Sequence, residues 1–252
     1  MESLRSPFQG ITNIIRFNRH LYLSTLALVI SGVLVQFYLP GVWSNIVCFL
    51  SIIGGIIIFI SLMVSFYVYD LSALYQFQYL EEINIGPKII NIHAGFDETS
   101  AIIQDKFPDA ELSVLDFYDP LQHTEISIKR ARKAYPPYPS TLKTSTTKLP
   151  FERHSTDTIF LVFAAHEIRE DAERILFFSE LCRIIKPGGK IIVTEHLRDL
   201  PNFLAYNIGF FHFLSEQTWN NTFKKSGLTM FKETKNNVFI RTFILTTHDI
   251  TS

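Results

Sequence analysis

The stretch that decides the fold is LCRIIKPGGKIIV, residues 181–193. Its first part has helical spacing, Lys186-Pro187-Gly188-Gly189 ends that helix, and residues 190–194 form an apolar, β-rich run. A second run of this kind, residues 158–164, precedes the predicted helix over residues 172–185. Strands that are apolar on both faces are typical of a parallel sheet covered by helices. The sequence therefore predicts a strand–helix–strand unit at the centre of an α/β domain.

Strands and helices also alternate upstream of this unit. Short β-rich runs at residues 88–92 and 112–117 are each followed by a helical segment, at residues 99–107 and 125–133. This alternation predicts right-handed crossovers and a doubly wound, mostly parallel sheet, closed by an antiparallel hairpin from residues 228–245. Such sheets bind ligands at the carboxyl ends of their strands, so we expect the functional residues there.

The composition excludes several classes of protein. Of 252 residues, 47% are hydrophobic and 19% are charged, which excludes a disordered or collagen-like chain. The 23 basic and 24 acidic residues give a net charge of −1, so there is no basic footprint and nucleic acid is not an expected partner. The two cysteines form no CxxC pair and no disulfide framework.

The charge is absent from one fifth of the chain. No Asp, Glu, Lys or Arg occurs between His20 and Tyr69. A turn at Leu39-Pro40-Gly41 divides this block into residues 21–38 and 42–68, about 27 Å and about 40 Å of helix, and each is long enough to span a bilayer. We predict a transmembrane α-hairpin, while a signal peptide and a buried core hairpin remain alternatives.

Basic residues before the first span predict the orientation. Arg5, Arg16 and Arg19 precede it and the connecting loop is uncharged, which places the N-terminus in the cytoplasm. The hairpin returns the large C-terminal part to the same side, as in a two-pass protein of a bacterial inner membrane. The predicted parts are a cytoplasmic basic N-terminus (1–19), two transmembrane helices (20–69), a linking helix (70–86) and an α/β domain (87–252).

Three stretches together resemble a known family. They are residues 181–193, Lys148-Leu149-Pro150-Phe151 before the strand at 158–164, and Ala164-Ala165-His166-Glu167-Ile168. Their order and spacing resemble class I S-adenosylmethionine-dependent methyltransferases, in the small-molecule branch that includes quinone methyltransferases. The resemblance covers roughly residues 69–245. It implies a Rossmann-like methyltransferase fold, S-adenosyl-L-methionine as cofactor, and methyl transfer to a small molecule.

The cofactor loop departs from the family pattern. The family has acid-x-Gly-x-Gly-x-Gly, whereas Asn91-Ile92-His93-Ala94-Gly95-Phe96-Asp97 keeps only the middle glycine. Asp116, at the end of the second strand, matches the acid that binds the ribose hydroxyls. Ser145 falls where the family often has an acid that faces adenine. The cofactor-binding residues that the resemblance implies are Asn91, His93, Gly95, Asp97, Asp116, Phe117 and Ser145.

Histidines follow three strands that the family's strand order makes neighbours. His93, His166 and the pair Glu195-His196 stand at these strand ends. They can line a substrate pocket where an imidazole takes a proton from a hydroxyl, they can be hydrogen-bonded structural groups, or they can bind a divalent metal. We assign His166, Glu195 and His196 as catalytic residues and predict no metal site.

Two further features have open alternatives. The basic run at residues 129–133 is either a solvated helix face or a contact with anionic lipid. Phe210, Phe211, Phe213 and Trp219 are either core and site-covering residues or a lipid-binding lid.

The sequence favours a membrane-anchored methyltransferase that acts on a lipophilic small molecule, such as a quinone, an alkylphenol or a polyene. A tether that holds the active site near the bilayer raises the effective concentration of an acceptor that partitions into lipid. The membrane and this acceptor are the expected partners. The alternative is a non-catalytic, methyltransferase-like membrane protein that binds a lipid, a cofactor or a partner protein.

Overall fold

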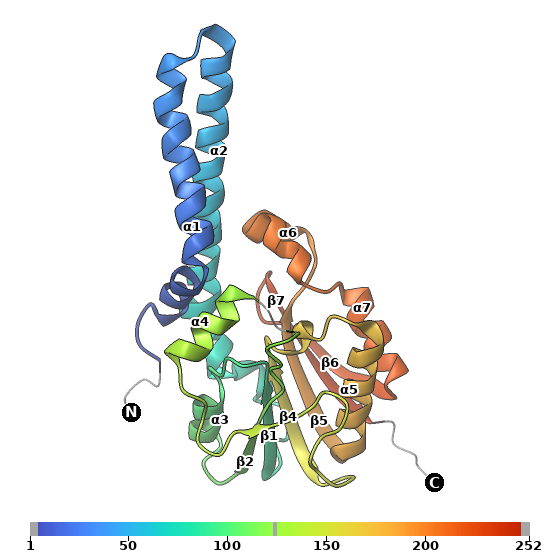
Figure 1. Ribbon diagram of the computed structural model, residues 1–252. Helices are drawn as coiled ribbons and strands as arrows, with labels where there is room; N and C mark the ends of the chain where they lie inside the picture. The colour runs from blue at the N-terminus through green and yellow to red at the C-terminus, as the bar shows by residue number, and fades with distance from the viewer. Residues whose placement is uncertain (1–4, 123–124, 248–252) are drawn as a thin grey trace.

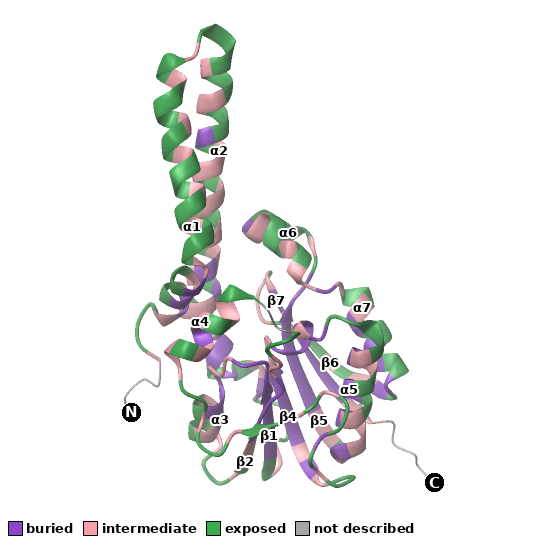
Figure 2. Cartoon of the chain, viewed as in Figure 1, coloured by how far each residue is buried: buried purple, intermediate pink, exposed green. Residues whose placement is uncertain are grey.

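A long helical hairpin precedes an α/β domain in the computed structural model, which describes residues 5–122 and 125–247 (Figure 1). Helix α1 (Gln9–Val35) and helix α2 (Gly41–Phe66) lie side by side, joined by a 3₁₀ turn (Gln36–Tyr38) and Pro40. Both helices are long and apolar enough to cross a membrane, judged by length and composition. Almost none of either apolar window is buried within the protein, so the hairpin is not a core element (Figure 2).

The base of the hairpin is fixed to the domain. The Asp70 carboxylate follows α2 and accepts hydrogen bonds from the backbone N–H groups of Gly10 and Ile11, at 2.7 and 2.8 Å. It therefore caps the start of α1, where backbone donors have no partner within the helix. Asn13 and Phe17, both buried, pack against the domain. The N-terminal segment predicted as a separate basic region is therefore largely the first turns of α1.

The connection from the hairpin to the sheet differs from the prediction. Instead of one linking helix over residues 70–86, a π-helical turn (Tyr67–Leu71) leads into 3₁₀ turns (Ala73–Gln76 and Gln78–Leu80). Ser72 is extended and Phe77 has a positive φ of 50°, so helical hydrogen bonding cannot continue through either residue. The large apolar side chains of the two 3₁₀ turns and of Phe77 between them pack against the domain.

The domain is built on a seven-stranded sheet with the order β3-β2-β1-β4-β5-β7-β6. The strands are β1 (Lys88–His93), β2 (Glu111–Asp116), β3 (Leu142–Lys143), β4 (Thr156–Val162), β5 (Ile185–His196), β6 (Leu228–Lys235) and β7 (Ile240–Thr247). The first five are parallel, and β7 pairs antiparallel with both β5 and β6. The predicted doubly wound sheet with a C-terminal antiparallel hairpin is confirmed.

Helices cover both faces of the sheet (Figure 1). They are α3 (Ser100–Lys106), α4 (Ile126–Ala134), α5 (Asp171–Ile184), α6 (Leu200–Tyr206) and α7 (Glu216–Lys225), and a 3₁₀ segment (Asn207–His212) follows α6. Of the aromatic residues with two readings, Trp219 is fully buried in the core under α7, whereas Phe211 is 64% exposed. Trp219 is therefore a core residue, whereas Phe211 lies at the surface.

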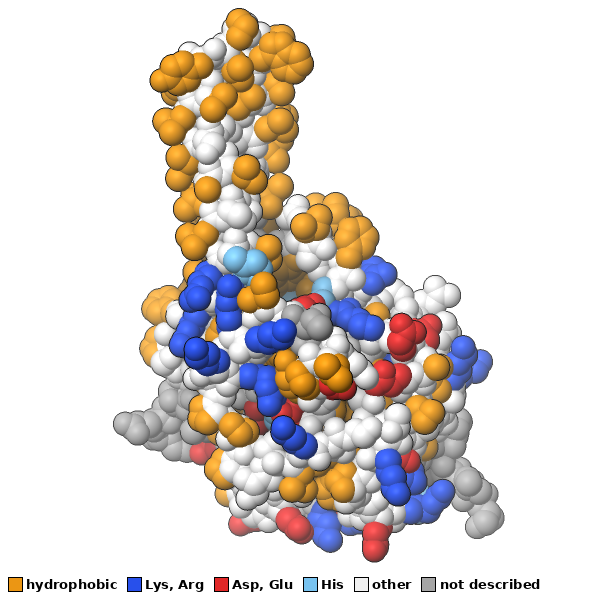
Figure 3. Space-filling model, in the orientation of Figure 1, with side chains coloured by type: hydrophobic (Ala, Val, Ile, Leu, Met, Phe, Trp, Pro, Cys, Tyr) orange, Lys and Arg blue, Asp and Glu red, His pale blue; other side chains and the backbone are white. Residues whose placement is uncertain are grey.

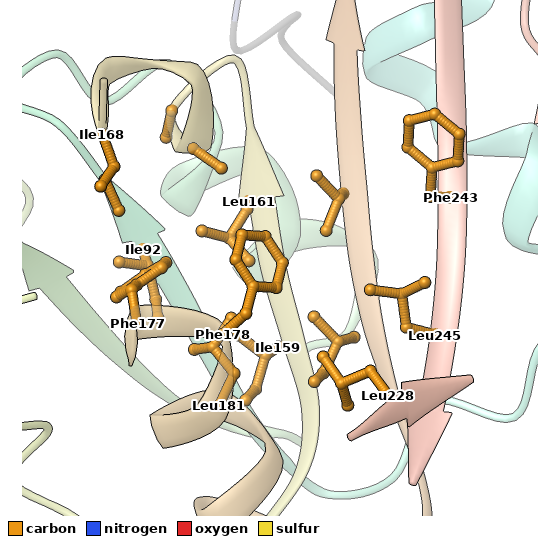
Figure 4. Packing of buried hydrophobic residues seen from close by; sticks show 14 of the residues in the cluster. Ile92, Ile159, Leu161, Ile168, Phe177, Phe178, Leu181, Leu228, Phe243 and Leu245 are labelled. Carbon is orange, nitrogen blue, oxygen red and sulfur yellow. The ribbon is translucent and has the colours of Figure 1, made fainter. Parts of the chain in front are cut away.

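The core follows the alternation of side chains along the central strands. In β4, Ile159 and Leu161 point into one cluster with Phe177 and Phe178 of α5 (Figure 4), while Phe160 between them points to the opposite face. Both faces of this strand are therefore buried, as its continuous apolar run predicts.

The Lys-Pro-Gly-Gly step ends α5 as predicted but lies within the bounds of β5, beside a register shift against β4. A Cβ on Gly189 would lie 2.8 Å from the Asp157 carbonyl oxygen, so only glycine fits this approach. The step therefore joins helix and strand with no separate loop.

Candidate active site

The carboxyl edge of the sheet brings the predicted residues together in two groups. His93 and Asp116 are direct neighbours in the β1–β2 register, so both strands end at the same level. On the other side, the 3₁₀ turn that follows β4 (Ala165–Glu167) lies against the end of β5. We call the first group the nucleotide half and the second the acceptor half, after the roles that the resemblance implies for them.

Asp116 in the nucleotide half is buried and already bound. Its Oδ2 accepts a hydrogen bond from Arg132 Nη1 at 2.6 Å, and its Oδ1 accepts one from the Tyr118 backbone N–H at 3.0 Å. Arg132 comes from α4, stacks over the Tyr118 ring and also donates to the Gly95 carbonyl at 3.2 Å. A ribose that binds to Asp116 must therefore displace this guanidinium.

The loop after β1 makes room for Arg132. Gly95 has a φ of 96°, and a Cβ there would lie 2.9 Å from Arg132 Nη1 and from the Tyr118 ring. A side chain at Gly95 would therefore strain the backbone and crowd both neighbours. The one glycine kept from the family pattern stands where the backbone approaches the Asp116 pair.

Asn91 and Asp97 form a polar pair beneath this loop. Asn91 Nδ2 donates to Ser100 Oγ at 2.7 Å and to Thr99 Oγ1 at 3.0 Å. Asp97 Oδ1 accepts from the backbone N–H groups of the same two residues, at 3.0 and 2.9 Å. Asn91 Oδ1 and Asp97 Oδ2 are buried acceptors with no hydrogen-bond partner among the described residues. Buried polar atoms of this kind are expected to bind a ligand or water.

His93 lies between these two features and is separate from the other histidines. Its Nδ1 accepts a hydrogen bond from the Gly95 backbone N–H at 3.1 Å and lies 3.7 Å from Asp116 Oδ1. Burial lowers the pKa of His93 below its ordinary value, although the Asp97 and Asp116 carboxylates act in the opposite direction. His93 is thus a neutral ring at pH 7, and of the two cavities nearby it lines only the one at the loop after β1.

The two remaining predicted cofactor residues contribute unequally. Phe117 is 3% exposed and its ring packs against Phe177 in the core, 5.6 Å between ring centroids. Ser145 is exposed on the wall of a cavity of about 330 Å³ that Asp116 also lines. Ser145 can therefore meet a ligand with its hydroxyl, whereas Phe117 borders the cavity but commits its ring to the core.

The acceptor half centres on a histidine–carboxylate pair. His166 Nδ1 lies 2.6 Å from Glu195 Oε2, and the His166 backbone N–H donates to Glu195 Oε1 at 3.2 Å. Burial acts to lower the pKa of His166, but the Glu195 and Glu167 carboxylates outweigh it and raise the pKa to about 10. The ring is therefore protonated at neutral pH, and the acid–base role assigned from an ordinary imidazole pKa requires that its proton first be lost.

His196 follows Glu195 in β5, and its pKa is shifted in the opposite direction to that of His166. Its Nδ1 lies 3.0 Å from Asn202 Oδ1 and 3.1 Å from the Phe239 carbonyl oxygen, which can only accept, so Nδ1 carries the proton. Its Nε2 then accepts from the Tyr69 hydroxyl at 2.8 Å. Burial lowers the pKa of His196 to about 4. With both nitrogens bound within the protein, His196 does not fit the catalytic role that we assigned to it.

Two cavities meet between the halves. One of about 100 Å³ lies at the cofactor loop, lined by His93, Ala94 and Thr99. The other, about 220 Å³, lies between the base of the hairpin and the strand ends, lined by Phe17 and His166. The residues that line both are Phe96, Glu98, Ile128, Phe163 and Glu167. The two cavities therefore share a wall that contains two carboxylates.

Several residues of the site carried no signal in the sequence. Arg132 lies in a basic run typical of a solvated helix, and His212 lies in an irregular segment 46 positions after His166. Glu98 accepts hydrogen bonds from Arg5 and Asn13 of the N-terminal segment, each at 3.1 Å. Only Glu167 could have been found, because it directly follows His166 in the quoted stretch.

Comparison with known proteins agrees with this fold. A family model described as a methyltransferase domain matches residues 120–193. No curated protein matches the chain significantly. The matched residues run from the segment before α4 to the inner part of β5, so they include Ser145 and His166.

Solved structures extend the likeness beyond these residues. An S-adenosylmethionine-dependent methyltransferase from Methanosarcina mazei aligns with a TM-score of 0.50 at 13% identity, over 68% of this chain and 97% of that one. Another from Clostridium acetobutylicum gives 0.50 at 10% identity, over 69% and 89%. A candidate O-methyltransferase from Nostoc punctiforme gives 0.52 at 15% identity, over 75% and 59%. The chain therefore has the Rossmann-like methyltransferase fold.

Proposed function

We propose that this protein is a membrane-anchored, S-adenosyl-L-methionine-dependent methyltransferase that acts on a lipophilic small molecule. The observation that carries the proposal is the shared wall of the two cavities at the strand ends. It supports a methyl group on the cofactor side lying next to a second cavity that would hold the acceptor. The fold and the family match support the cofactor.

The residues of the nucleotide half fit this cofactor. Asp116 would hold the ribose once Arg132 moves aside, and Ser145 would lie beside the adenine in the cavity of about 330 Å³. Asn91 Oδ1 and Asp97 Oδ2, the buried acceptors without partners, would receive the amino group of the methionine part. Asp97 thereby supplies the negative charge that Asn91 lacks at the family's acidic position. When bound, the cofactor supplies a methyl group on a sulfonium.

The acceptor half would position the second substrate. Glu167 lines both cavities and lies 3.5 Å from His166 Nε2, so its carboxylate and the ring meet where the acceptor would lie. Glu195 holds the His166 ring through Nδ1 and leaves Nε2 directed away from β5. We assign His166 as the residue that contacts the acceptor and Glu195 as its positioning residue.

The apolar surface supports a location at a bilayer. Figure 3 shows hydrophobic side chains over the hairpin and over α6, while Lys and Arg side chains gather around the hairpin base. The exposed apolar residues on α6 and the segment after it are Leu200, Phe203, Leu204, Ile208 and Phe211. Helix α6 contacts α2, so this patch continues the surface of the hairpin. Contiguous exposed apolar surface of this kind marks an interaction site.

The same geometry supports a lipophilic acceptor. The larger cavity is lined by Ile14 and Phe17 of α1 on one side and by Phe163 and Phe213 of the domain on the other. An acceptor that partitions into lipid would reach this cavity along the base of the hairpin. A quinone, an alkylphenol or a polyene has the apolar body that these walls favour.

A second function is favoured by one observation, the Arg132–Asp116 contact. A protein that has lost its cofactor could keep this pair closed and bind only a lipid or a partner protein. Calorimetry on the full chain in detergent separates the two functions. Binding of S-adenosylmethionine supports the methyltransferase, and the absence of heat at millimolar cofactor leaves the binding protein.

The topology has its own test. Cysteine labelling in intact cells should reach the Pro40-Gly41 turn from outside, whereas positions Ser6 and Ser252 should be protected, because both lie on the cytoplasmic side in this proposal. The variant Val42→Cys is suited to the first measurement, since Val42 directly follows the turn and is 64% exposed. Labelling of Ser252→Cys from outside would overturn the orientation.

A further inference from the structure

Two histidines and a carboxylate converge beside the acceptor cavity. Glu167 Oε1 lies 3.5 Å from His166 Nε2 and 3.4 Å from His212 Nε2. One ligand atom from each of these three side chains lies within 4.8 Å of the other two. The chain brings them from two segments, the 3₁₀ turn after β4 and the end of the segment after α6.

Each imidazole is oriented by a further carboxylate. His166 Nδ1 lies 2.6 Å from Glu195 Oε2, and His212 Nδ1 lies 3.1 Å from Glu125 Oε1. Metal-binding histidines have this arrangement, in which one nitrogen donates to a carboxylate and the other is directed at the ion. Here it directs the Nε2 atoms of both rings toward the same oxygen of Glu167.

From this geometry we propose that His166, Glu167 and His212 bind a divalent transition metal, with zinc as the first choice. Ligands about 2.1 Å from a tetrahedral zinc ion lie about 3.4 Å from one another, close to the separations of Glu167 from both rings. Two histidines and one glutamate form a set that zinc enzymes use with an open fourth position. The sequence-based prediction of no metal is replaced by this proposal.

The Arg169 side chain would compete with a metal ion for this site. Its guanidinium Nη2 lies 2.8 Å from His212 Nε2, and it also contacts His212 Nδ1 and the His212 carbonyl. Arg169 is exposed, so its side chain can turn into solvent when an ion binds. A cation thus already lies against the cluster, which is consistent with the charge of the surrounding carboxylates.

An ion bound here would lie beside the acceptor cavity, where it could act on the acceptor. The acceptor cavity is lined by His166 and Glu167, so the open position would face it. If the proposed function holds, this position would receive the acceptor oxygen, because a bound metal lowers the pKa of a coordinated hydroxyl. Metal binding itself does not depend on methyl transfer and can be measured without the cofactor.

The test is zinc binding to the full chain in detergent, after removal of metal with a chelator and without S-adenosylmethionine. We expect one zinc ion per chain by competition with a chromogenic chelator, and cobalt substituted for zinc should give visible d–d absorption bands. His212→Ala should weaken zinc binding about 100-fold or more, and Glu125→Gln about tenfold, since loss of an outer-shell partner costs 10- to 100-fold.

Two matched variants give the sharpest outcome. Arg169→Ala removes the competing cation and should tighten zinc binding several-fold. His154→Ala removes an exposed histidine at the opposite end of the strands, bonded to the Ile185 carbonyl, and should leave binding unchanged. Binding that is absent, or equal in His212→Ala and His154→Ala, overturns the proposal. If His212→Ala does not fold, two other variants test the proposal. Glu167→Gln should weaken zinc binding, whereas Arg169→Ala should tighten it.

Discussion

The two halves of the strand edge hold their carboxylates in different ways. In the nucleotide half, Asp116 is bound to Arg132 of helix α4, and the Arg132 side chain is 29% exposed. In the acceptor half, Glu195 is bound to His166, and both are buried at the ends of adjacent strands. The first partner can move away without disturbing the sheet, whereas the second cannot. We infer that the nucleotide half is opened by its ligand and that the acceptor half is preorganised.

The largest expected effect comes from a substitution in the preorganised acceptor half. His166→Gln should slow methyl transfer by about 10²-fold or more, because the side chain would no longer hold the acceptor beside Glu167 and a misplaced substrate reacts about 10²-fold more slowly. Cofactor affinity should stay within about twofold, since His166 touches no residue of the nucleotide half in the described structure. Single-turnover rates and calorimetry measure the two quantities separately.

His154→Gln is the matched control, because this exposed ring lies at the opposite end of the strands. An unchanged transfer rate in a folded His166→Gln protein would contradict the assignment. A protein that unfolds instead would make His166 a structural group.

The second effect tests the nucleotide half. Asp116→Ala should cost about 2 to 4 kcal/mol of cofactor binding, about 30- to 1,000-fold, because two charge-assisted hydrogen bonds to the ribose are lost. Ser145→Ala removes only a neutral hydroxyl at the cavity wall and should cost about tenfold at most. Equal affinity in the original protein and a folded Asp116→Ala variant would remove Asp116 from the cofactor site.

The third effect separates the two neighbouring histidines by pH. The pKa of His196 is lowered to about 4 in the folded protein, while an unfolded chain has about 6.5. The unfolded state therefore binds the proton more strongly, so stability is fully present above about pH 6.5 and is lost as the pH falls toward 4. The loss reaches about 3 kcal/mol at most.

Urea unfolding in detergent at pH 7.5 and pH 5 measures this dependence. His196→Gln should raise the stability at pH 5 relative to that at pH 7.5, because the group that gains a proton on unfolding is gone. His166, whose pKa is raised, favours the fold at the lower pH in both proteins. His154→Gln should keep the slope of the original protein. If the stability difference between the two pH values is the same in His196→Gln as in the original protein, another group is responsible.

The acceptor half was easier to predict from sequence than the nucleotide half. β4 and β5 are continuous apolar runs whose strand character does not depend on distant residues, and both their positions and their adjacency are confirmed. The pairing of His166 with Glu195 follows from that adjacency. The β3 strand, only two residues long, carries no pattern of its own and was not predicted.

The rest depends on contacts between segments far apart in the chain. The basic run at residues 129–133 gave no sign that Arg130 would bind the Phe17 carbonyl at 2.7 Å, or that Arg132 would reach Asp116. The linking helix was wrong because burial of Leu74 and Phe77 against the sheet outweighs helical propensity. The two arginine contacts leave no periodic signal in the sequence, since each joins one side chain to a partner that only the tertiary structure brings near.

The smallest expected effect tells whether the Arg132 side chain competes with the cofactor for Asp116 or binds the cofactor itself. If the Arg132–Asp116 contact only competes with the ribose, Arg132→Leu removes a partly exposed ion pair of about 1 kcal/mol and should tighten cofactor binding about fivefold. Arg130→Leu is the matched control, because Arg130 bonds the Phe17 carbonyl from the same helix and does not touch Asp116. If Arg132 instead turns to hold the carboxylate of the methionine part, Arg132→Leu weakens binding and only the control stays unchanged. The sign of this one change therefore tells a displaced guanidinium from a ligand-binding one, and with it whether the two halves differ as we infer.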